Sequence, residues 1–168
     1  MLSKYHKFYM KRYLLFFCLI ITALSACKKS DTDNFDHEAQ AKIDDAKIVA
    51  YLAANSITAV KDPSGLYYQI ITPGSADNPI LSNGPYITYR GSLMETGVVF
   101  DEKTTPYYFS KLDGLIEGWK IGLPKIGKGG RIMLYVPSGL GYKNQESSDG
   151  KIPANSVLIF DVTLVNFN

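Results

Sequence analysis

The stretch Gly114-Leu-Ile-Glu-Gly-Trp119 contains the only tryptophan of the chain. The sequence continues as Lys120-Ile-Gly-Leu-Pro-Lys-Ile-Gly-Lys-Gly-Gly-Arg-Ile-Met-Leu-Tyr-Val-Pro137. This order predicts one or two turns of helix, a glycine-rich connection and a strand over Arg131–Val136 whose alternate residues from Ile132 face one way. Pro124 predicts an early end of the helix, because proline lacks the N–H donor that an interior helical position uses.

Further strands are predicted on both sides of this stretch. Leu66–Ile71 and Tyr86–Arg90 are rich in β-branched and aromatic residues. Leu93–Phe100 predicts a hairpin bend with Gly97 at the position that needs a positive φ. Val157–Val165 is almost continuously apolar, which predicts a central strand covered on both faces. A sheet with one helix laid across it predicts an α+β half-barrel.

The N-terminus resembles a secretory signal over residues 1–26, with a basic start, the apolar run Tyr13–Leu24 and then small residues. The apolar run is too short for a bilayer, which takes roughly 20 residues. Leu24-Ser-Ala-Cys27 resembles the bacterial lipobox, whose cysteine is lipidated; the alternative is an ordinary signal with a coincidental cysteine. We expect attachment to a membrane through a lipid on Cys27, in the cell envelope and at the outer membrane of a Gram-negative bacterium. Met10 is an alternative start, because the basic residues after it supply a sufficient n-region.

A helix is predicted over Asp36–Ala54, with Asp36 as its N-cap and with Ile48 and Leu52 one turn apart. One apolar stripe on a short helix is more often a docking surface than a binding site. We therefore expect an arm that packs on the domain or on a second copy of the chain. The predicted organisation is a signal at 1–26, a polar tether at 27–35, a helical arm and linker at 36–63 and a domain at 64–168.

Charge and residue inventory exclude several classes of function. Loss of residues 1–26 removes four of the 18 basic residues and leaves 14 against 16 acidic ones, so no nucleic-acid partner is expected. Cys18 lies in the signal, so Cys27 leaves no partner for an intrachain disulfide. His37 is then the only histidine, which rules out a His-based triad or His metal site in the domain. No metal or other cofactor is expected.

The domain is rich in aromatic residues that lie near strand ends and in loops. They are Tyr89, Phe100, Tyr107, Phe109, Trp119, Tyr142 and Phe160, alongside the aliphatic residues Leu115, Ile116 and Ile152. Any single one is better explained as core. Taken together, they suit a catalyst that needs no proton transfer.

These residues fall in blocks that resemble the family of FKBP-type peptidyl-prolyl cis-trans isomerases. The blocks, in the family's order and close to its spacing, are Tyr86–Leu93, Gly97–Asp101, Pro106–Phe109, Gly114–Trp119, Pro137–Tyr142 and Ile152–Asp161. The resemblance covers about residues 64–168. It implies an α+β fold in which an FKBP-like antiparallel half-barrel wraps on a short helix, here preceded by the N-terminal helix.

The resemblance also implies a site and an activity. The family's catalytic pocket corresponds here to Tyr89, Phe100, Asp101, Trp119, Tyr142 and Phe160, and its substrate contacts to Tyr107, Phe109, Leu115, Ile116 and Ile152. In the family, the main-chain N–H matching Ile116 and the hydroxyl matching Tyr142 bind carbonyl groups of the ligand. The implied function is rotation about X-Pro bonds in exported proteins by a membrane-tethered folding helper, with proline-containing polypeptides as substrates.

Two other functions remain open: a non-catalytic chaperone or binding module, and a structural subunit of an envelope complex that docks through Asp36–Ala54. Lys143 stands where the family commonly has glycine, and Asn144–Gly150 is a polar loop without the family's small-residue pattern. This loop contacts substrate in the family. The departures therefore bear on substrate preference more than on the fold.

Overall fold

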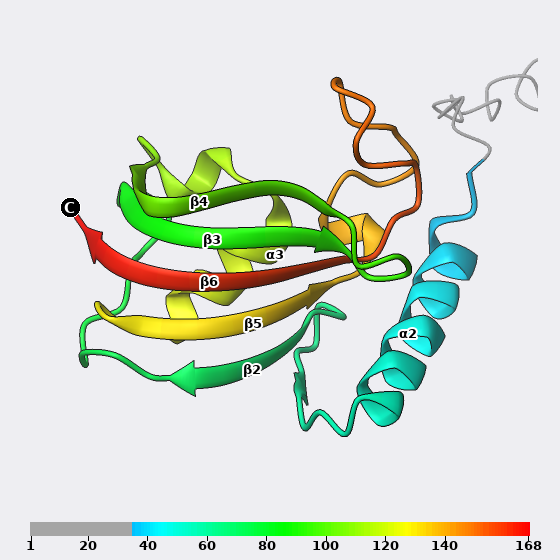
Figure 1. Cartoon of the computed structure of the whole chain (residues 1–168), viewed down its shortest axis with the longest axis horizontal. Coiled ribbons are helices and arrows are strands. Elements are labelled where there is room, and N and C mark those ends of the chain that lie inside the picture. The colour runs from blue at the N-terminus through cyan, green and yellow to red at the C-terminus, as the bar shows by residue number, and fades with distance from the viewer. Residues whose placement is uncertain (1–34) are drawn as a thin grey trace, which may run out of the picture. The chain divides into compact units, whose positions relative to one another are not determined.

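A single antiparallel sheet of six strands, in the order β1-β2-β5-β6-β3-β4, organises the computed structural model (Figure 1). The strands are β1 (Val60–Lys61), β2 (Tyr67–Thr72), β3 (Pro85–Leu93), β4 (Val99–Tyr108), β5 (Gly130–Val136) and β6 (Leu158–Phe167). The structure describes residues 35–168, which form one unit. The predicted signal, Cys27 and the tether up to residue 34 lie outside the described residues.

The helices lie on one face of the sheet and at one end of it (Figure 1). They are α2 (His37–Ala54), α3 (Glu117–Gly122) and the short 3-10 turns η2 (Leu112–Gly114), η3 (Leu123–Lys125) and η4 (Ser138–Leu140). The early end predicted from Pro124 is confirmed, since α3 stops at Gly122 and Pro124 lies in the 3-10 turn that follows. The antiparallel sheet and its helix confirm the predicted α+β class.

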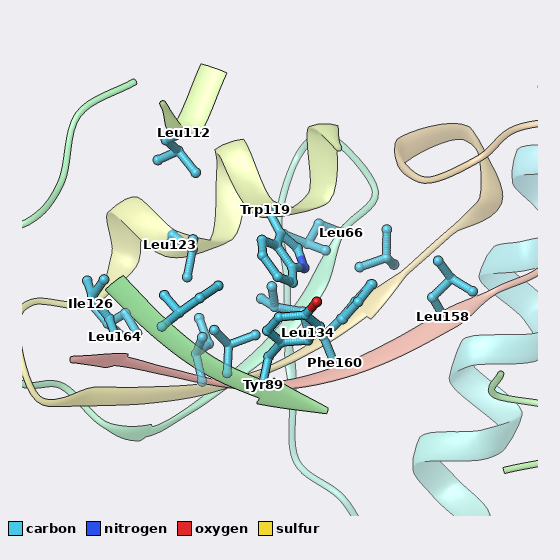
Figure 2. Close-up of a cluster of buried hydrophobic side chains, with 14 of the residues drawn as sticks. Leu66, Tyr89, Leu112, Trp119, Leu123, Ile126, Leu134, Leu158, Phe160 and Leu164 are labelled. Atoms are coloured by element: carbon cyan, nitrogen blue, oxygen red, sulfur yellow. The ribbon is translucent and has the colours of Figure 1, made fainter. Parts of the chain in front are cut away.

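The main core lies between α3 and the inner face of the sheet (Figure 2). Ile132, Leu134 and Val136 of β5 all face this core and are fully buried, which confirms the predicted alternation. The hairpin between β3 and β4 also forms as predicted: Gly97 has a φ of 71°, and its N–H donates to the Leu93 carbonyl oxygen at 2.8 Å. The core therefore holds α3 against the middle of the sheet.

Strand β6 has the predicted central position, but the prediction that both of its faces are buried is wrong. The strand is central, between β5 and β3. On its outer face only Ile159 is buried, whereas Val165 is 41% exposed. Asp161, also on the outer face, forms a two-pronged ion pair with Arg131, with N–O distances of 2.8 and 2.6 Å. Within residues 35–168 no helix covers this part of the outer face, so polar pairs replace apolar packing there.

Helix α2 begins as predicted, with the Asp36 side chain accepting a hydrogen bond from the Ala39 N–H at 2.9 Å. Its buried residues Ile48 and Leu52 meet the end of the sheet in a second apolar cluster with Tyr67, Met94, Tyr135, Val157 and Ile159. The helix therefore packs on the domain, the first of the two alternatives that the sequence left open. Among residues 35–168, none of the helices combines the length and apolar character that crossing a membrane requires.

An ion pair joins the turn after β1 to η3. Lys125 Nζ lies 2.7 Å from Asp62 Oδ2, and the two side chains are 24% and 17% exposed. The Ser64 N–H also donates to Asp62, at 3.0 Å. These donors, the ammonium group first, lower the pKa of Asp62 from 3.8 to about 2.

Acid is therefore expected to weaken the fold through Asp62. A carboxylate with a lowered folded-state pKa stabilises the protein at pH values above its unfolded pKa, and this contribution disappears as the pH falls from about 4 to about 2. Allowing for solvent screening, the wild type should lose about 1 kcal/mol more than Asp62→Asn over this range. Urea denaturation of both proteins at several pH values tests this, and parallel losses would contradict it.

Candidate active site

A cavity of about 390 Å³ lies on the inner face of the sheet, beside α3 and the loop after η4. The residues predicted for the site come together here from separate parts of the chain. Tyr89, Phe100, Asp101, Phe109, Leu115, Ile116, Trp119, Tyr142, Ile152 and Phe160 all line the cavity. Their roles toward a substrate stay predictions, but their common location is a property of the structure.

Trp119 lies at the centre of a cage of aromatic rings (Figure 2). Its ring meets Tyr89, Phe109 and Phe160 edge to face, with centroid distances of 5.0, 5.7 and 5.2 Å. Phe100 meets Phe160 in the same way at 5.6 Å. Edge-to-face pairs are a preferred arrangement of aromatic rings. The cage fixes the indole and forms a rigid apolar wall of the cavity.

The chain before α3 leaves a main-chain donor at the wall of the cavity. Ile116 is the N-cap of α3, with the extended angles φ −60° and ψ 150°, and its carbonyl oxygen accepts from the Trp119 N–H at 3.0 Å. Its own N–H makes no hydrogen bond to any group in residues 35–168. A ligand carbonyl at the cavity wall would satisfy this donor.

Tyr142, in the loop after η4, supplies a second donor at the cavity. Its ring is 39% exposed, and its hydroxyl makes no hydrogen bond within the described part of the chain. Burial, and then the negative charges of Asp149 and Asp101, raise the pKa of Tyr142. A raised pKa keeps the hydroxyl protonated and able to donate at neutral pH.

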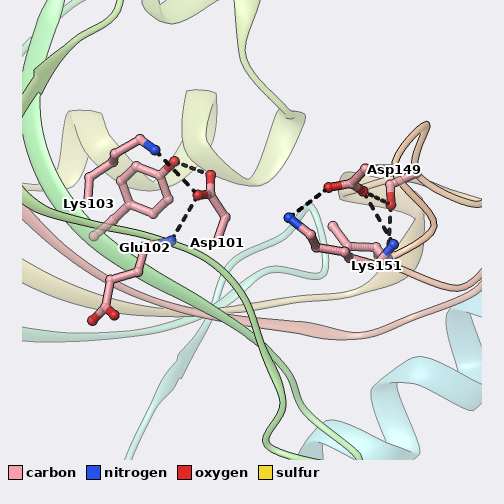
Figure 3. Close-up of polar contacts among 8 residues, drawn as sticks. Asp101, Glu102, Lys103, Asp149 and Lys151 are labelled. Atoms are coloured by element: carbon pink, nitrogen blue, oxygen red, sulfur yellow. Dashed lines mark hydrogen bonds and ion pairs between the residues drawn. The ribbon is translucent and has the colours of Figure 1, made fainter.

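Asp101 and Tyr89 form a polar edge to the otherwise apolar cage (Figure 3). The Tyr89 hydroxyl donates to Asp101 Oδ2, the Glu102 N–H donates to Asp101 Oδ1 at 2.9 Å, and Lys103 Nζ lies 3.6 Å from the same oxygen. Burial, followed by the hydrogen bond to Asp101, raises the pKa of Tyr89 well above its usual value. The pair is therefore a neutral phenol bound to a fixed carboxylate.

The loop before Ile152 also lines the cavity, through Ser147, Ser148, Asp149 and Lys151. The resemblance had implied that the loop Asn144–Gly150 contacts substrate, but none of these four residues was predicted as a site residue. Asp149 accepts from the Ser147 hydroxyl at 2.8 Å and pairs with Lys151 Nζ at 3.1 Å (Figure 3). These contacts, with the Ser147 bond the largest, lower the pKa of Asp149 to about 2. The available signal was the loop's position between the predicted site residues Tyr142 and Ile152.

Tyr107 is the one predicted site residue that does not line the cavity. It is 48% exposed and meets Phe109 edge to face at 4.9 Å. Lys103 Nζ lies 5.7 Å from the centre of its ring. Tyr107 thus supports the cage from outside, and a role at the rim toward substrate remains a prediction.

A larger hollow of about 630 Å³ lies between α2, the turn Pro63–Gly65 and the segment Pro137–Lys143. It contains no cage of rings and mixes charged side chains of both signs, such as Glu38 and Lys61. The smaller cavity is the stronger candidate for chemistry, because it combines an apolar wall with the free donors of Ile116 and Tyr142.

The fold and the cavity define a class of protein: a small α+β domain whose cavity combines an apolar wall around an indole with two unpaired hydrogen-bond donors. The sequence model described as FKBP-type peptidyl-prolyl cis-trans isomerase matches residues 86–165. The chain is 35% identical over 145 residues to the FKBP-type peptidyl-prolyl cis-trans isomerase FkpA of Escherichia coli strain K12, covering 84% of this chain and 50% of that relative. It is 36% identical over 137 residues to the probable FkpA of Neisseria meningitidis, covering 77% and 48%.

Solved structures agree with these relatives. The crystal structure of FkpA from Escherichia coli matches with a TM-score of 0.63 and 33% identity, over 95% of this chain and 71% of that one. A peptidyl-prolyl cis-trans isomerase from Pseudomonas syringae matches with a TM-score of 0.67 and 25% identity, over 80% and 98%. The chain belongs to the family of FKBP-type peptidyl-prolyl cis-trans isomerases, which confirms the resemblance seen in the sequence. It spans about half the length of the curated relatives that it matches.

Proposed function

We propose that this chain catalyses cis-trans isomerisation of X-Pro bonds in proline-containing polypeptides. The observation that carries this proposal is the ring cage around Trp119, bordered by the unpaired donors of Ile116 and Tyr142. The cage accepts a proline ring, and the two donors form hydrogen bonds to carbonyl oxygens on either side of it. Membership of the family of FKBP-type peptidyl-prolyl cis-trans isomerases supports the assignment.

The physical task is to twist an amide. Rotation about a peptide bond meets a barrier of about 18–20 kcal/mol, because conjugation between nitrogen and carbonyl is lost. The twisted amide is less dipolar than the planar one, so an apolar and poorly hydrated wall favours the twisted state over the planar state. The Tyr142 hydroxyl and the Ile116 N–H hold the chain on both sides while the bond rotates.

A cavity of this kind can supply the transition-state stabilisation that the reaction needs. Uncatalysed proline isomerisation has a rate of about 0.01 per second, and acceleration to about 1000 per second requires about 7 kcal/mol of transition-state stabilisation. Desolvation by the cage and two or three fixed hydrogen bonds supply energies of this order without a nucleophile or a proton transfer.

The test is a protease-free isomerisation assay on the full chain in a mild detergent, with a short peptide that contains one Ala-Pro bond. The wild type should accelerate the exchange, and Asp101→Val should lower kcat/KM about tenfold, because Tyr89 then loses its acceptor. Glu102→Val is the matched control, since the Glu102 side chain points away from the polar cluster (Figure 3). A folded chain that binds the peptide without accelerating its isomerisation would overturn the proposal and favour the binding module.

We also propose that the enzyme acts on exported proteins while tethered by a lipid on Cys27, at the outer membrane of a Gram-negative bacterium. The support is the sequence Leu24-Ser-Ala-Cys27 at the end of an apolar run. In cells fed a labelled fatty acid, the wild type should carry the label and sediment with membranes, and Cys27→Ser should do neither. Labelling of Cys27→Ser, or an unlabelled wild type, would refute the tether.

A further inference from the structure

The buried Asp44 of α2 reaches the turn that leads into the cavity. Asp44 is 0% exposed, and Ser138, at the start of η4, is 1% exposed. Asp44 Oδ2 accepts from both the Ser138 N–H, at 2.8 Å, and the Ser138 hydroxyl, at 2.6 Å. Asp44 Oδ1 accepts from the Gln40 amide at 2.7 Å. Asp44 thus engages both donors of Ser138, across 94 positions of sequence.

Ser138 in turn holds the residues on both sides of Tyr142. Its carbonyl oxygen accepts from the Gly141 N–H at 2.9 Å and from the Lys143 N–H at 2.8 Å. Lys143 adopts a φ of 63°, the left-handed conformation that a lysine rarely takes, so this turn depends on its hydrogen bonds. A continuous series of contacts therefore runs from Asp44 through Ser138 to the backbone on either side of Tyr142.

We propose that Asp44 is a positioning residue for the isomerase: it fixes the Ser138–Lys143 turn and, through it, the Tyr142 hydroxyl. This inference rests on the proposed function, in which Tyr142 binds a substrate carbonyl. Asp44 does not line the cavity, so its effect on a bound substrate would pass through the turn. Asp44 lies outside the matched family region of residues 86–165, so the proposal adds one positioning contact from α2 and gives the rest of the helix no role in the reaction.

The physical argument is one of precision. A misplacement of about 1 Å in a binding group lowers the rate by up to about 100-fold. Without the carboxylate, the Ser138 N–H and hydroxyl are buried donors without an acceptor, and the turn relaxes to satisfy them. The Tyr142 hydroxyl then samples positions in which it no longer meets the carbonyl.

A purely structural role for Asp44 makes a different prediction. Helix α2 is also docked by Ile48, which is fully buried, and by Lys47, whose Nζ lies 2.5 Å from Glu95. If Asp44 only keeps α2 in place, loosening the helix through Ile48 should have the same effect on activity. If Asp44 acts through Tyr142, only the Asp44 change should alter it.

The experiment is a double-mutant cycle on the full chain in detergent, with the Ala-Pro peptide. Asp44→Ala should lower kcat/KM about tenfold, Tyr142→Phe should lower it by a similar factor, and the double variant should be no worse than Tyr142→Phe. Ile48→Ala, a matched loss of α2 packing, should lower the thermal midpoint but leave kcat/KM within about twofold of the wild type. Multiplying effects in the double variant, or an equal loss in Ile48→Ala, would overturn the inference.

Two additions keep the outcome interpretable. If Asp44→Ala does not fold, Ser138→Ala takes its place, because it removes the hydroxyl contact and keeps the main-chain one. Peptide affinity is measured on the same proteins through the fluorescence of Trp119, the only tryptophan. An inactive wild type would refute the proposed function, and the coupling between Asp44 and Tyr142 would still be read from affinity.

Discussion

Replacing Trp119 by leucine is expected to lower kcat/KM for the Ala-Pro peptide by about 10- to 100-fold, the largest effect on activity of any single change in the cavity. Leucine keeps part of the volume but removes the flat surface on which a proline ring would lie. It also removes three edge-to-face contacts, so Tyr89, Phe109 and Phe160 lose their common partner. The loss should appear mainly in the rate, because the twisted amide needs the apolar wall most.

Loss of stability has to be separated from loss of the site. Trp119 is only 4% exposed, and its truncation leaves a cavity in the main core. Tyr135→Leu is the matched control, because Tyr135 is an aromatic residue of 2% exposure in the second cluster, beneath α2. Circular dichroism gives the folded fraction of each variant, and activity is expressed per folded molecule. On this scale Tyr135→Leu should retain the activity of the wild type. Equal losses in both variants would show that the effect of Trp119 is not specific to the cavity.

Gly118→Ala is expected to reduce the free energy of unfolding by about 1–3 kcal/mol, although alanine is the better helix former. Helix α3 lies so close to β5 that a Cβ atom on Gly118 would stand 2.7 Å from Val136 Cγ1 and 2.9 Å from Cγ2. Val136 is fully buried and β-branched, so its χ1 angle is restricted and its side chain has no free space to move into. The helix has to move away from the sheet instead.

Gly114→Ala provides the control from the same stretch of sequence. A Cβ atom on Gly114 would have no atom within 4 Å beyond those of its two neighbours in the chain. Its free energy of unfolding should stay within about 0.5 kcal/mol of the wild type in urea denaturation. Since α3 carries Trp119, Gly118→Ala should also lower isomerase activity. Equal stability of the two variants would mean that the close approach of α3 to β5 does not constrain the fold.

Local patterns determined the α+β class, the hairpin at Gly97, the N-cap at Asp36 and the end of α3 before Pro124. Each depends on a property of a few consecutive residues: a positive φ, a short polar side chain, a missing N–H or an alternation of apolar positions. The location of the cavity residues came from the order of the family's blocks. Tyr89, Trp119 and Phe160 meet in the structure as that order implies.

Only the tertiary structure decided what depends on distant parts of the chain. It placed α2 on the domain, left the outer face of β6 open at Asp161, and joined Asp44 to Ser138. It also separated Gly118, which touches Val136, from Gly114, which touches nothing. The physical reason is that burial and hydrogen bonding are set by which surfaces meet across the fold, and a glycine or an aspartate looks the same in the sequence whichever neighbour it finds.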